Sequence, residues 1–575
     1  MNSFNSFLET ANAFLWHNAV LFLVLGTGIT FTLWTRFSQF RSLTHGLHVI
    51  RGRYDNPADP GAINHFQALS AALSATVGLG NIGGVALAIS LGGPGAVFWM
   101  WVVGFFGMAI KTTEVTLAML YRNTSDPDNP HGGAMWVISK ALSDGPPWQQ
   151  KLGKLIGGLF CITLLVTVVT GGNMFQAWNV GNMTELYFGV PGIVAGIALA
   201  IIVGLVILGG IHRIGRVAAA LVPFMITIYF VAAIYVLAMN ISEIPAMFGL
   251  IFRSAFSPTE ASGAFIGGTM GYAFLYGMKR AIFSNEAGQG TSPIAHSAAK
   301  TSEPAREAVV AGLEPFIDTI VTCTVTALVI IVTGTWNRPA EATLPHEVRA
   351  VVAAPGEWTL PPSDAPTRIG STWSGGERVF VILRSAPNAQ TGNDLHRLSG
   401  TVVAGDSGKA VIEWSTLQSA EPPEMTDHGV YVSYVGAALT AVAFDSVMPG
   451  LGRWVVTLAV WLFAISTMIS YSYYAEQGIV YLAGERWVGP FKYVYCSLAI
   501  IATLGFLKSD AQLDNLSGLG TGLMLFVNIP IMWFMGHRAM RAYRDYMARL
   551  DSGQMGAGHA PPSLRDVITG HDVDP

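Results

Sequence analysis

Residues 74–84 read SATVGLGNIGG, and they interrupt an apolar segment that is otherwise long enough to cross a membrane. Four of the seven residues from Gly78 to Gly84 are glycine, and each glycine costs a helix about 1 kcal/mol relative to alanine. Thr76 and Asn81 add polar side chains at the same place. We predict that the helix breaks here and that the freed backbone groups bind a ligand, because such breaks line ligand sites in membrane proteins. Glycines that allow close packing between helices are the alternative interpretation.

A second interruption lies further along the chain, where residues 283–293 read FSNEAGQGTSP. This segment is too polar to cross lipid as a continuous helix. A loop at the membrane surface is the alternative. The match between the two places, each with a helix that runs into glycine and small polar residues, favours a second broken helix. The N-terminal ends of such half-helices carry partial positive charge and suit a carboxylate ligand.

The composition excludes an ordinary soluble protein. Of the 575 residues, 12% are charged and 51% are apolar, and the mean hydropathy is +0.46, whereas soluble domains have about 25% charged residues. We therefore expect membrane lipid around most of the surface. The net charge of −4 gives no indication of nucleic acid, and we expect no nucleic-acid partner. The 3 cysteines lie in apolar runs without metal-ligand spacing, and the first apolar run lacks the flanks of a cleaved signal peptide.

Apolar segments of the length that spans a bilayer, about 20 residues, recur along the chain. Lys and Arg gather in alternate loops, which the positive-inside rule places in the cytoplasm. We therefore expect the N-terminus outside and the C-terminus in the cytoplasm. With the first segment set aside, ten helices divide as five plus five, as in inverted repeats. The eleven predicted spans are Phe14–Trp34, His65–Leu91, Pro94–Tyr121, Leu155–Val180, Val190–Ile211, Val217–Met239, Gly263–Phe283, Ala308–Thr335, Trp454–Leu482, Tyr493–Leu507 and Gly518–Met535.

One polar stretch departs from this pattern. Short alternating runs, such as Arg378–Leu383 and Lys409–Ser415, predict strands of a small β-rich insertion on the outer face. We expect the insertion to be dispensable. The predicted fold class is an all-α polytopic membrane protein with broken first and sixth core helices and this extracytoplasmic insertion. Its predicted parts are residues 1–335 (leading helix and core helices one to seven), 336–436 (insertion), 437–540 (core helices eight to ten) and 541–575 (disordered cytoplasmic tail).

Polar residues inside apolar segments are costly, so each is a candidate for function. The Gln176 amide can hold a charged end of a ligand or join two helices. The Ser466 and Thr467 hydroxyls can bond to the preceding turn or contribute to a cation site, since hard cations prefer oxygen ligands. The remaining acidic residues at this depth are expected to be paired structurally or to lie near gates: Glu114, Glu314, Asp318 and Glu476.

Four strings of residues resemble the alanine-or-glycine:cation symporters, also called sodium:alanine symporters. They are residues 74–84, 171–176, 284–293 and 466–478, and the resemblance covers about 15–335 and 436–540. It implies a leucine-transporter-type fold, of the amino-acid–polyamine–organocation architecture, with an added leading helix. The outer insertion departs from the family pattern, and Tyr471 stands where tryptophan is expected in many members.

The resemblance also implies two sets of site residues. In that fold the breaks in core helices one and six bind the charged ends of an amino acid, and oxygens beside the first break bind sodium. The substrate-binding residues carried over are Thr76, Gly78, Gly80, Asn81, Gln176, Ser284, Asn285 and Gly288. The sodium-binding residues carried over are Ser74, Val77, Phe463, Ser466 and Thr467.

The function that we expect is sodium-coupled symport of a small neutral amino acid, alanine or glycine, into a bacterial cell across the inner membrane. The alternative is proton coupling, with Glu286 or Glu314 as the carrier. A sensor is disfavoured because the tail is too short for a signalling domain. An enzyme is disfavoured because no nucleophile or metal cluster is spaced for catalysis. The choice among alanine, glycine and serine, the enantiomer and the oligomeric state stay open.

Overall fold

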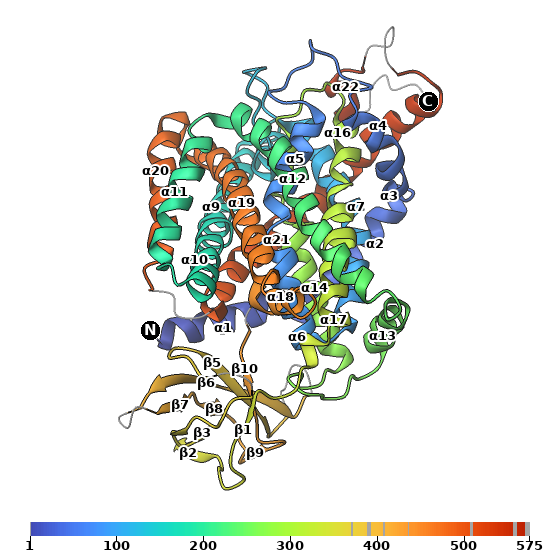
Figure 1. Ribbon diagram of the computed structural model, residues 1–575. Coiled ribbons are helices and arrows are strands. Elements are labelled where there is room, and N and C mark those ends of the chain that lie inside the picture. The colour runs from blue at the N-terminus through green and yellow to red at the C-terminus, as the bar shows by residue number, and fades with distance from the viewer. Residues whose placement is uncertain are drawn as a thin grey trace.

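The computed structural model describes residues 2–369, 372–387, 393–405, 409–434, 436–505, 510–555 and 561–569. Most of these residues are helical, and the helices run side by side through one body (Figure 1). The α-helices are α1 (Asn2–Leu15), α2 (Asn18–Trp34), α3 (Ser38–Arg41), α4 (Leu47–Ile50), α5 (His65–Thr76), α6 (Val85–Gly92), α7 (Gly95–Tyr121), α8 (Ala134–Ala141), α9 (Pro147–Val169), α10 (Phe175–Phe188), α11 (Gly192–Ile207), α12 (Gly210–Met239), α13 (Ile244–Phe256), α14 (Met270–Asn285), α15 (Ser292–His296), α16 (Pro304–Ala311), α17 (Thr324–Val332), α18 (Ala437–Asp445), α19 (Gly452–Ala483), α20 (Val488–Ala502), α21 (Asp510–Asp551) and α22 (Leu564–Thr569).

Short helical segments of other types join some of these helices. Four are π-helical: η1 (Ser42–Gly46), η2 (Gly80–Gly84), η3 (Thr170–Met174) and η4 (Phe316–Cys323). Two are 3₁₀-helical: η5 (Thr335–Asn337) and η6 (Glu485–Trp487). π-Helical turns inside α-helices often mark functional sites, and η2 and η4 both bear on the site described below.

Several helices are long and apolar enough to cross a membrane. Among the described residues there are 7, or 8 if the bent pair His65–Thr76 and Gly80–Gly92 counts as one span. The count of eleven therefore stays a prediction. The predicted span Gly263–Phe283 is helical only from Met270, because Gly263 and Gly267 adopt positive φ values of 53° and 78°.

The first predicted break is present in the structure. Helix α5 is capped at its N-terminus by Asn64, which forms a capping box with Gln67, and it is followed by Val77, whose ψ of 90° leaves the helical region. The Asn81 side chain then accepts a hydrogen bond from the Gly78 N–H at 2.8 Å. The chain turns by 51° before it continues through η2 into α6. An asparagine side chain thus replaces the backbone acceptor that the break removes.

The second predicted break is also present. Helix α14 is capped at its N-terminus by Thr269, whose hydroxyl accepts a hydrogen bond from the Tyr272 N–H, and it ends at Asn285. Glu286 has a φ of 56° in the left-handed region, and the chain stays non-helical until α15 begins at Ser292. The polar residues that predicted a break therefore form the connection between two helices.

The strands lie between residues 342 and 432 and form two antiparallel sheets in the described part of the chain. One has the order β1-β10-β5-β6-β7-β4, with β9 also paired to β5, and the other has the order β2-β3-β8. The longest pairing joins β5 to β6, with Val381 opposite Leu398. The strands are β1 (Ala342–Thr343), β2 (Val351–Ala354), β3 (Glu357–Thr359), β4 (Ser363–Asp364), β5 (Arg378–Arg384), β6 (Leu395–Ala404), β7 (Ala410–Trp414), β8 (Leu417–Gln418), β9 (Glu424–Met425) and β10 (Gly429–Val432).

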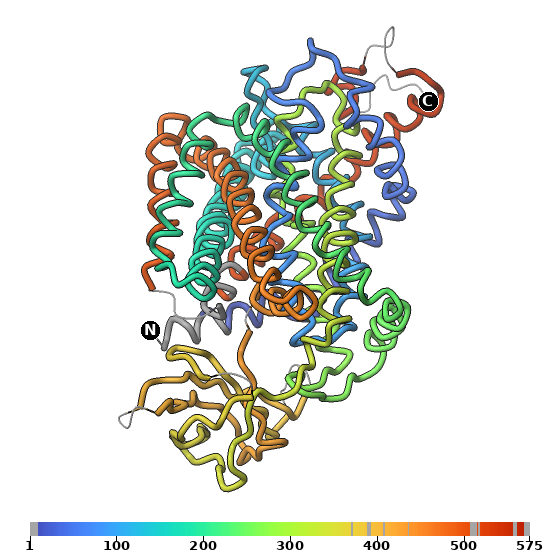
Figure 2. The backbone as a smooth tube through the Cα atoms, viewed as in Figure 1, coloured from blue at the N-terminus to red at the C-terminus, as the bar shows by residue number. Residues whose placement is uncertain are grey.

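The sheets pack on one end of the helical body (Figure 1). Figure 2 shows the chain leaving that body after α17 and returning to it at α18. The Arg397 guanidinium of β6 donates to the carbonyls of Ser90 and Ala264, each at 3.0 Å. Burial lowers the pKa of Arg397 to about 10, so the guanidinium stays charged at neutral pH. These bonds attach the sheet to the end of α6.

The predicted disordered tail at 541–575 requires a correction. Helix α21 continues to Asp551, because Tyr543 and Tyr546 are buried and Arg549 pairs with Glu303 at 2.6 Å. Helix α22 follows within the predicted tail, while residues 556–560 and 570–575 lie outside the described residues. Helices α1 and α22 lie at opposite ends of the helical body (Figure 1).

Candidate functional site

The two breaks meet around the carboxylate of Asp318, which lies on η4 and is fully buried. The Asn81 amide donates to Asp318 Oδ1 at 2.7 Å and to Ser284 Oγ at 3.1 Å. The Ser284 hydroxyl donates to Asp318 Oδ2 at 2.9 Å. A neighbouring bond joins the Asn285 amide to Thr319 Oγ1 at 3.1 Å. Asn81, Ser284 and Asn285 thus lie in one polar cluster, and their role in substrate binding stays a prediction.

A second set of oxygens lies between α5 and α19. The Ser466 hydroxyl is 2.7 Å from Ser74 Oγ and 3.1 Å from the Ser74 carbonyl oxygen. The Thr467 hydroxyl is 3.3 Å from the Ala75 carbonyl oxygen. All of these residues are buried. Neutral oxygens gathered in a buried space are the donors that a hard cation such as sodium prefers, so the residues present fit a sodium ion.

Gly78 is needed where α5 approaches α19. A Cβ atom at Gly78 would lie 2.6 Å from Thr467 Oγ1, closer than two such atoms can approach. Gly83 fills a packing role, because a Cβ there would lie 2.9 Å from the backbone nitrogen of Ala437 in α18. The glycines of the first break therefore agree with both interpretations of the sequence. Gly78 lies beside the proposed ligand site, and Gly83 allows close packing between helices.

Other predicted site residues make contacts elsewhere. The Thr76 hydroxyl bonds to the Ala72 carbonyl of its own helix at 3.3 Å. The Gly288 carbonyl accepts a hydrogen bond from the Asn528 side chain of α21 at 2.9 Å, so this contact is with α21 and not with the first break. The Gln176 amide donates to the Gly171 carbonyl at 3.1 Å. Its oxygen is buried and has no hydrogen-bond partner among the described residues.

Two of the predicted sodium ligands are hydrophobic residues of the same region. Val77 ends α5, and Phe463 of α19 is fully buried against the ring of Tyr229, with the ring centroids 5.8 Å apart. The Gly80 position lies where the breaks meet, since a Cβ there would lie 3.6 Å from Ser284 Cα.

The sequence analysis missed two contributors. Asp318 was expected only to be paired or to lie near a gate, yet its carboxylate is the centre of the cluster between the breaks. An acidic residue inside the apolar span Ala308–Thr335 was the available signal. Ala75 contributes only a backbone oxygen, and no side chain could have indicated that role.

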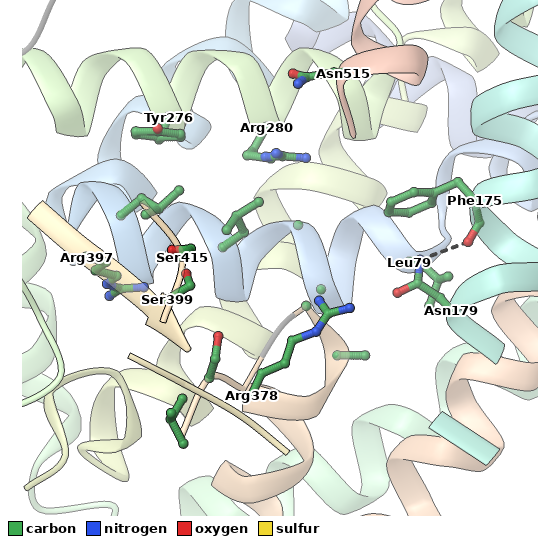
Figure 3. Close-up of a pocket in the computed structure, with 18 of the residues that line it drawn as sticks. Leu79, Phe175, Asn179, Tyr276, Arg280, Arg378, Arg397, Ser399, Ser415 and Asn515 are labelled. Atoms are coloured by element: carbon green, nitrogen blue, oxygen red, sulfur yellow. Dashed lines mark hydrogen bonds between the residues drawn. The ribbon is translucent and has the colours of Figure 1, made fainter. Parts of the chain in front are cut away.

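A cavity of about 840 Å³ lies between the first break and the sheets (Figure 3). Arg280 of α14 lines one side and Arg378 of β5 lines another (Figure 3). Phe175 and Phe283 line it close to Gly80, and their ring centroids are 6.2 Å apart. The sheets are therefore part of the cavity wall rather than a separate appendage.

The cavity has the size of a small-molecule site, and its charged lining is mainly cationic. Lys279, Arg280, Arg378 and Arg397 line it together with the carboxylate of Glu413. Lysine and arginine inside or beside apolar spans are costly, which makes Lys279 and Arg280 of α14 further candidates that the sequence analysis passed over. A cationic lining attracts anionic groups such as carboxylates.

Comparisons with known proteins give a family match over most of the chain. A family described as the sodium:alanine symporter family matches residues 1–361 and 424–559. The unmatched residues 362–423 hold strands β4 to β8.

Individual relatives are similar over most of their length. The sodium/alanine symporter AgcS of Methanococcus maripaludis is 35% identical over 526 residues, which cover 92% of this chain and 93% of that protein. The sodium/proton-dependent alanine carrier protein of Bacillus sp. (strain PS3) is 29% identical over 497 residues, covering 86% and 90%. Among solved structures, the crystal structure of MhsT in complex with L-phenylalanine has a TM-score of 0.48 at 14% identity, covering 85% of this chain and 93% of that one.

Proposed function

Because the chain belongs to the sodium:alanine symporter family, we propose that it carries a small neutral amino acid, alanine or glycine, into the cell together with sodium. The observation that supports this most strongly is the group of buried oxygens of Ser74, Ala75, Ser466 and Thr467. They come from a helix that breaks beside them and from the long helix α19. A cation held there would tie the break to α19.

The substrate path that we propose begins in the cavity under the sheets. A zwitterion would pass Phe175 and Phe283 and meet the broken helices at Gly80. The polar groups of the breaks would then hold its charged ends, as partial charges at helix ends and breaks do. The residues proposed for this role are Thr76, Gly78, Gly80, Asn81, Gln176, Ser284, Asn285 and Gly288.

The architecture that we propose has eleven spans, with a leading helix and five-plus-five inverted repeats whose first and sixth core helices are broken. Its parts are residues 1–335, the insertion 336–436, and residues 437–540, with the last part revised to run to the end of α21 at Asp551. The N-terminus and the insertion would face outward and the C-terminus the cytoplasm of a bacterial cell. The basic loops and the position of α1 and α22 at opposite ends (Figure 1) support this orientation.

Proton coupling is the second candidate function. One relative is named a sodium/proton-dependent alanine carrier protein. In this chain Glu286 and Glu314 are buried at the second break, where Glu286 accepts a bond from Thr291 at 2.5 Å and Glu314 one from Ser292 at 2.6 Å. A proton carrier would need such a carboxyl group.

Uptake of labelled alanine into liposomes that hold the pure protein tests the proposal. An inward sodium gradient should drive accumulation, and an inside-negative potential should raise the initial rate, because one sodium with one zwitterion carries one charge. At 100 mV that charge gains about 2.3 kcal/mol, or roughly fifty-fold accumulation. Equal uptake without sodium, driven by a pH gradient alone, would establish the second candidate. Phenylalanine competing as well as glycine would overturn the substrate class.

A further inference from the structure

A chain of buried ionisable side chains lies on the other side of the second break from the cavity. At its centre the His296 ring lies between two carboxylates, with Nδ1 2.5 Å from Glu307 Oε1 and Nε2 2.6 Å from Glu314 Oε1. The side chains of His296, Glu307 and Glu314 are 0% exposed. Glu314 Oε2 also lies 3.4 Å from Lys111 Nζ. Glu307 Oε2 bonds to Nδ1 of His65.

The geometry around His296 requires an extra proton. An ionised carboxylate can only accept hydrogen bonds, and each imidazole nitrogen either donates or accepts. If Glu307 and Glu314 are both ionised, both ring nitrogens must donate, and the ring is an imidazolium. If the ring is neutral, one of the two carboxyl groups must hold the proton. In every case the trio holds one proton more than a neutral histidine between two ionised glutamates.

The charges of the cluster lead to the same result. Without the extra proton, Lys111 is one cation against the carboxylates of Glu307 and Glu314, and the buried group carries a net negative charge. Two acceptor atoms would also face each other at about the length of a hydrogen bond. Uncompensated buried charge and unpaired buried acceptors are both costly. The extra proton removes both costs.

Other charged and titratable groups face the cluster from the elements around it. Near Lys111 lie two further carboxyl groups, those of Glu114 and Glu286, which add negative charge if they ionise. The Arg122 guanidinium faces Glu307 from the end of α7, and its charge offsets part of the charge of that carboxylate. Its hydrogen bonds go to backbone carbonyls such as that of Ser297 at 3.0 Å, so it does not replace the proton that the two contacts of the His296 ring require. The other titratable groups that face the cluster from the helices around it are His65 of α5 and Tyr471 and Tyr474 of α19.

The cluster joins the elements that flank both breaks. His65 lies at the start of α5, which runs into the first break, and His296 lies at the end of α15, which follows the second. Glu307 of α16 bonds to both histidines. His65 Nε2 lies 3.9 Å from Asp55, whose side chain is 44% exposed. Asp55 lies in the segment between α4 and α5, and α4 lies at the end of the molecule opposite the sheets (Figure 1).

We propose that His296, Glu307 and Glu314 form a proton-binding site, separate from the sodium site, whose proton clamps α15 to α5 and α16 in the conformation described here. The proton leaves when the helices around the trio separate: the O–H or N–H bond that holds it breaks, and a water molecule admitted there accepts it as H₃O⁺. No bond other than O–H and N–H forms or breaks. This inference goes beyond the proposed symport, and its first test does not depend on transport.

The first test locates the proton in the full-length protein in lipid. Nitrogen-15 NMR of the ring-labelled histidines at pH 8.5 should show one imidazolium among the 13 histidines, because exposed histidines with a pKa of about 6.5 are neutral there. Infrared spectroscopy detects the same proton if it resides on a carboxyl group, as a carboxylic-acid band that Glu314→Gln or Glu307→Gln removes. Either result supports the site. A neutral ring at His296 with no such band overturns it, and the measurement on the unaltered chain does not depend on the folding of a variant.

The second test examines the clamp. Alanine uptake is measured at matched internal and external pH between 6.5 and 8.5, at a saturating sodium gradient. A rate limited by loss of one proton rises with pH, by up to about tenfold per pH unit. His296→Gln should abolish this rise. The matched control is His45→Gln, because His45 is a buried histidine whose ring bonds to the Tyr546 hydroxyl at 2.8 Å. The control should keep the pH dependence of the wild type.

The outcomes are distinct. A pH dependence that survives in His296→Gln overturns the clamp. A protein that shows the extra proton but no sodium-driven uptake under any condition keeps the proton site and loses the proposed function. Sodium-driven uptake by a protein that lacks the extra proton keeps the proposed function and overturns the proton site.

Discussion

Charged side chains lie on both sides of the breaks. On one side they line a cavity, and on the other they are fully buried in an ion pair. Next to the sheets, the cationic groups of Arg280, Arg378 and Arg397 line a cavity of about 840 Å³. On the other side of the breaks, Lys111 and Glu314 are 0% exposed and paired. The side of the breaks toward the sheets therefore opens into a cavity, and the side that holds Lys111 and Glu314 is closed around these two side chains. Transport through a site between these two sides requires the closed side to separate while the cavity closes.

The largest loss of stability is expected when the buried pair of Lys111 and Glu314 loses one of its charges. Glu314→Ala removes the partner of Lys111 and one of the two carboxylates at His296. An unpaired buried charge costs about 3–5 kcal/mol, so the thermal unfolding midpoint of the protein in detergent should fall markedly. The double variant Lys111→Met with Glu314→Ala removes the unpaired charge and should recover part of the loss. Equal stability of the single and double variants would show that Lys111 is not held by Glu314.

A smaller effect is expected at the attachment of the sheets. Arg397→Met removes two charged hydrogen bonds to the carbonyls of Ser90 and Ala264, each worth about 1.5–3 kcal/mol. Hydrogen exchange in strand β6 and in residues 257–269 should rise by about tenfold or more. Uptake should fall as well, since the sheets supply part of the cavity wall.

The matched control for that variant lies in the same sheet. Arg384→Met removes an ion pair with Asp394, at 3.3 Å, whose two side chains are 62% and 48% exposed. Exposed pairs contribute little, so exchange and uptake should match the wild type. Full uptake in Arg397→Met despite a loosened sheet would support the expectation from sequence that the insertion is dispensable.

The smallest effect is expected inside the cavity. Glu413→Gln removes the one carboxylate among the charged residues that line it in the described structure. Glu413 is exposed, and salt screens its field over roughly 10 Å at 0.1 M. The sodium concentration for half-maximal uptake should rise by less than about twofold at low ionic strength and not at all at high ionic strength. A large change at high salt would place Glu413 in direct contact with a transported species.

The breaks could be predicted from the sequence because their causes are local. Glycine between residues 78 and 84 weakens a helix wherever the helix packs, and the polar run from Ser284 to Pro293 cannot cross lipid as a helix. The partners could not be predicted in the same way. Asp318 lies 237 residues after Asn81, and no local pattern indicates which face of η4 meets the breaks.

Other differences have similar causes. The alternating residues of β5 and β6 predicted strands, but alternation does not indicate what the sheet packs against, and the sheet lines the cavity. The composition of the tail suggested disorder from residue 541, whereas the packing of Tyr543 and Tyr546 extends α21 to Asp551. The proposed sodium ligands Ser74, Ser466 and Thr467 came from resemblance to a family, and their oxygens lie together in the structure.

Amino-acid binding across a sodium titration tests the central claim, that a sodium ion between α5 and α19 drives amino-acid uptake. The proteins compared are the wild type, Thr467→Ala and Thr467→Ser. Loss of one oxygen should cost about 1.4 kcal/mol, or about tenfold in sodium affinity. Since coupling is reciprocal, the apparent amino-acid affinity of Thr467→Ala should fall at low sodium and recover at saturating sodium, while Thr467→Ser stays near wild type. If Thr467→Ala weakens the amino acid equally at every sodium concentration, the hydroxyl does not bind the driving ion, and the account is contradicted.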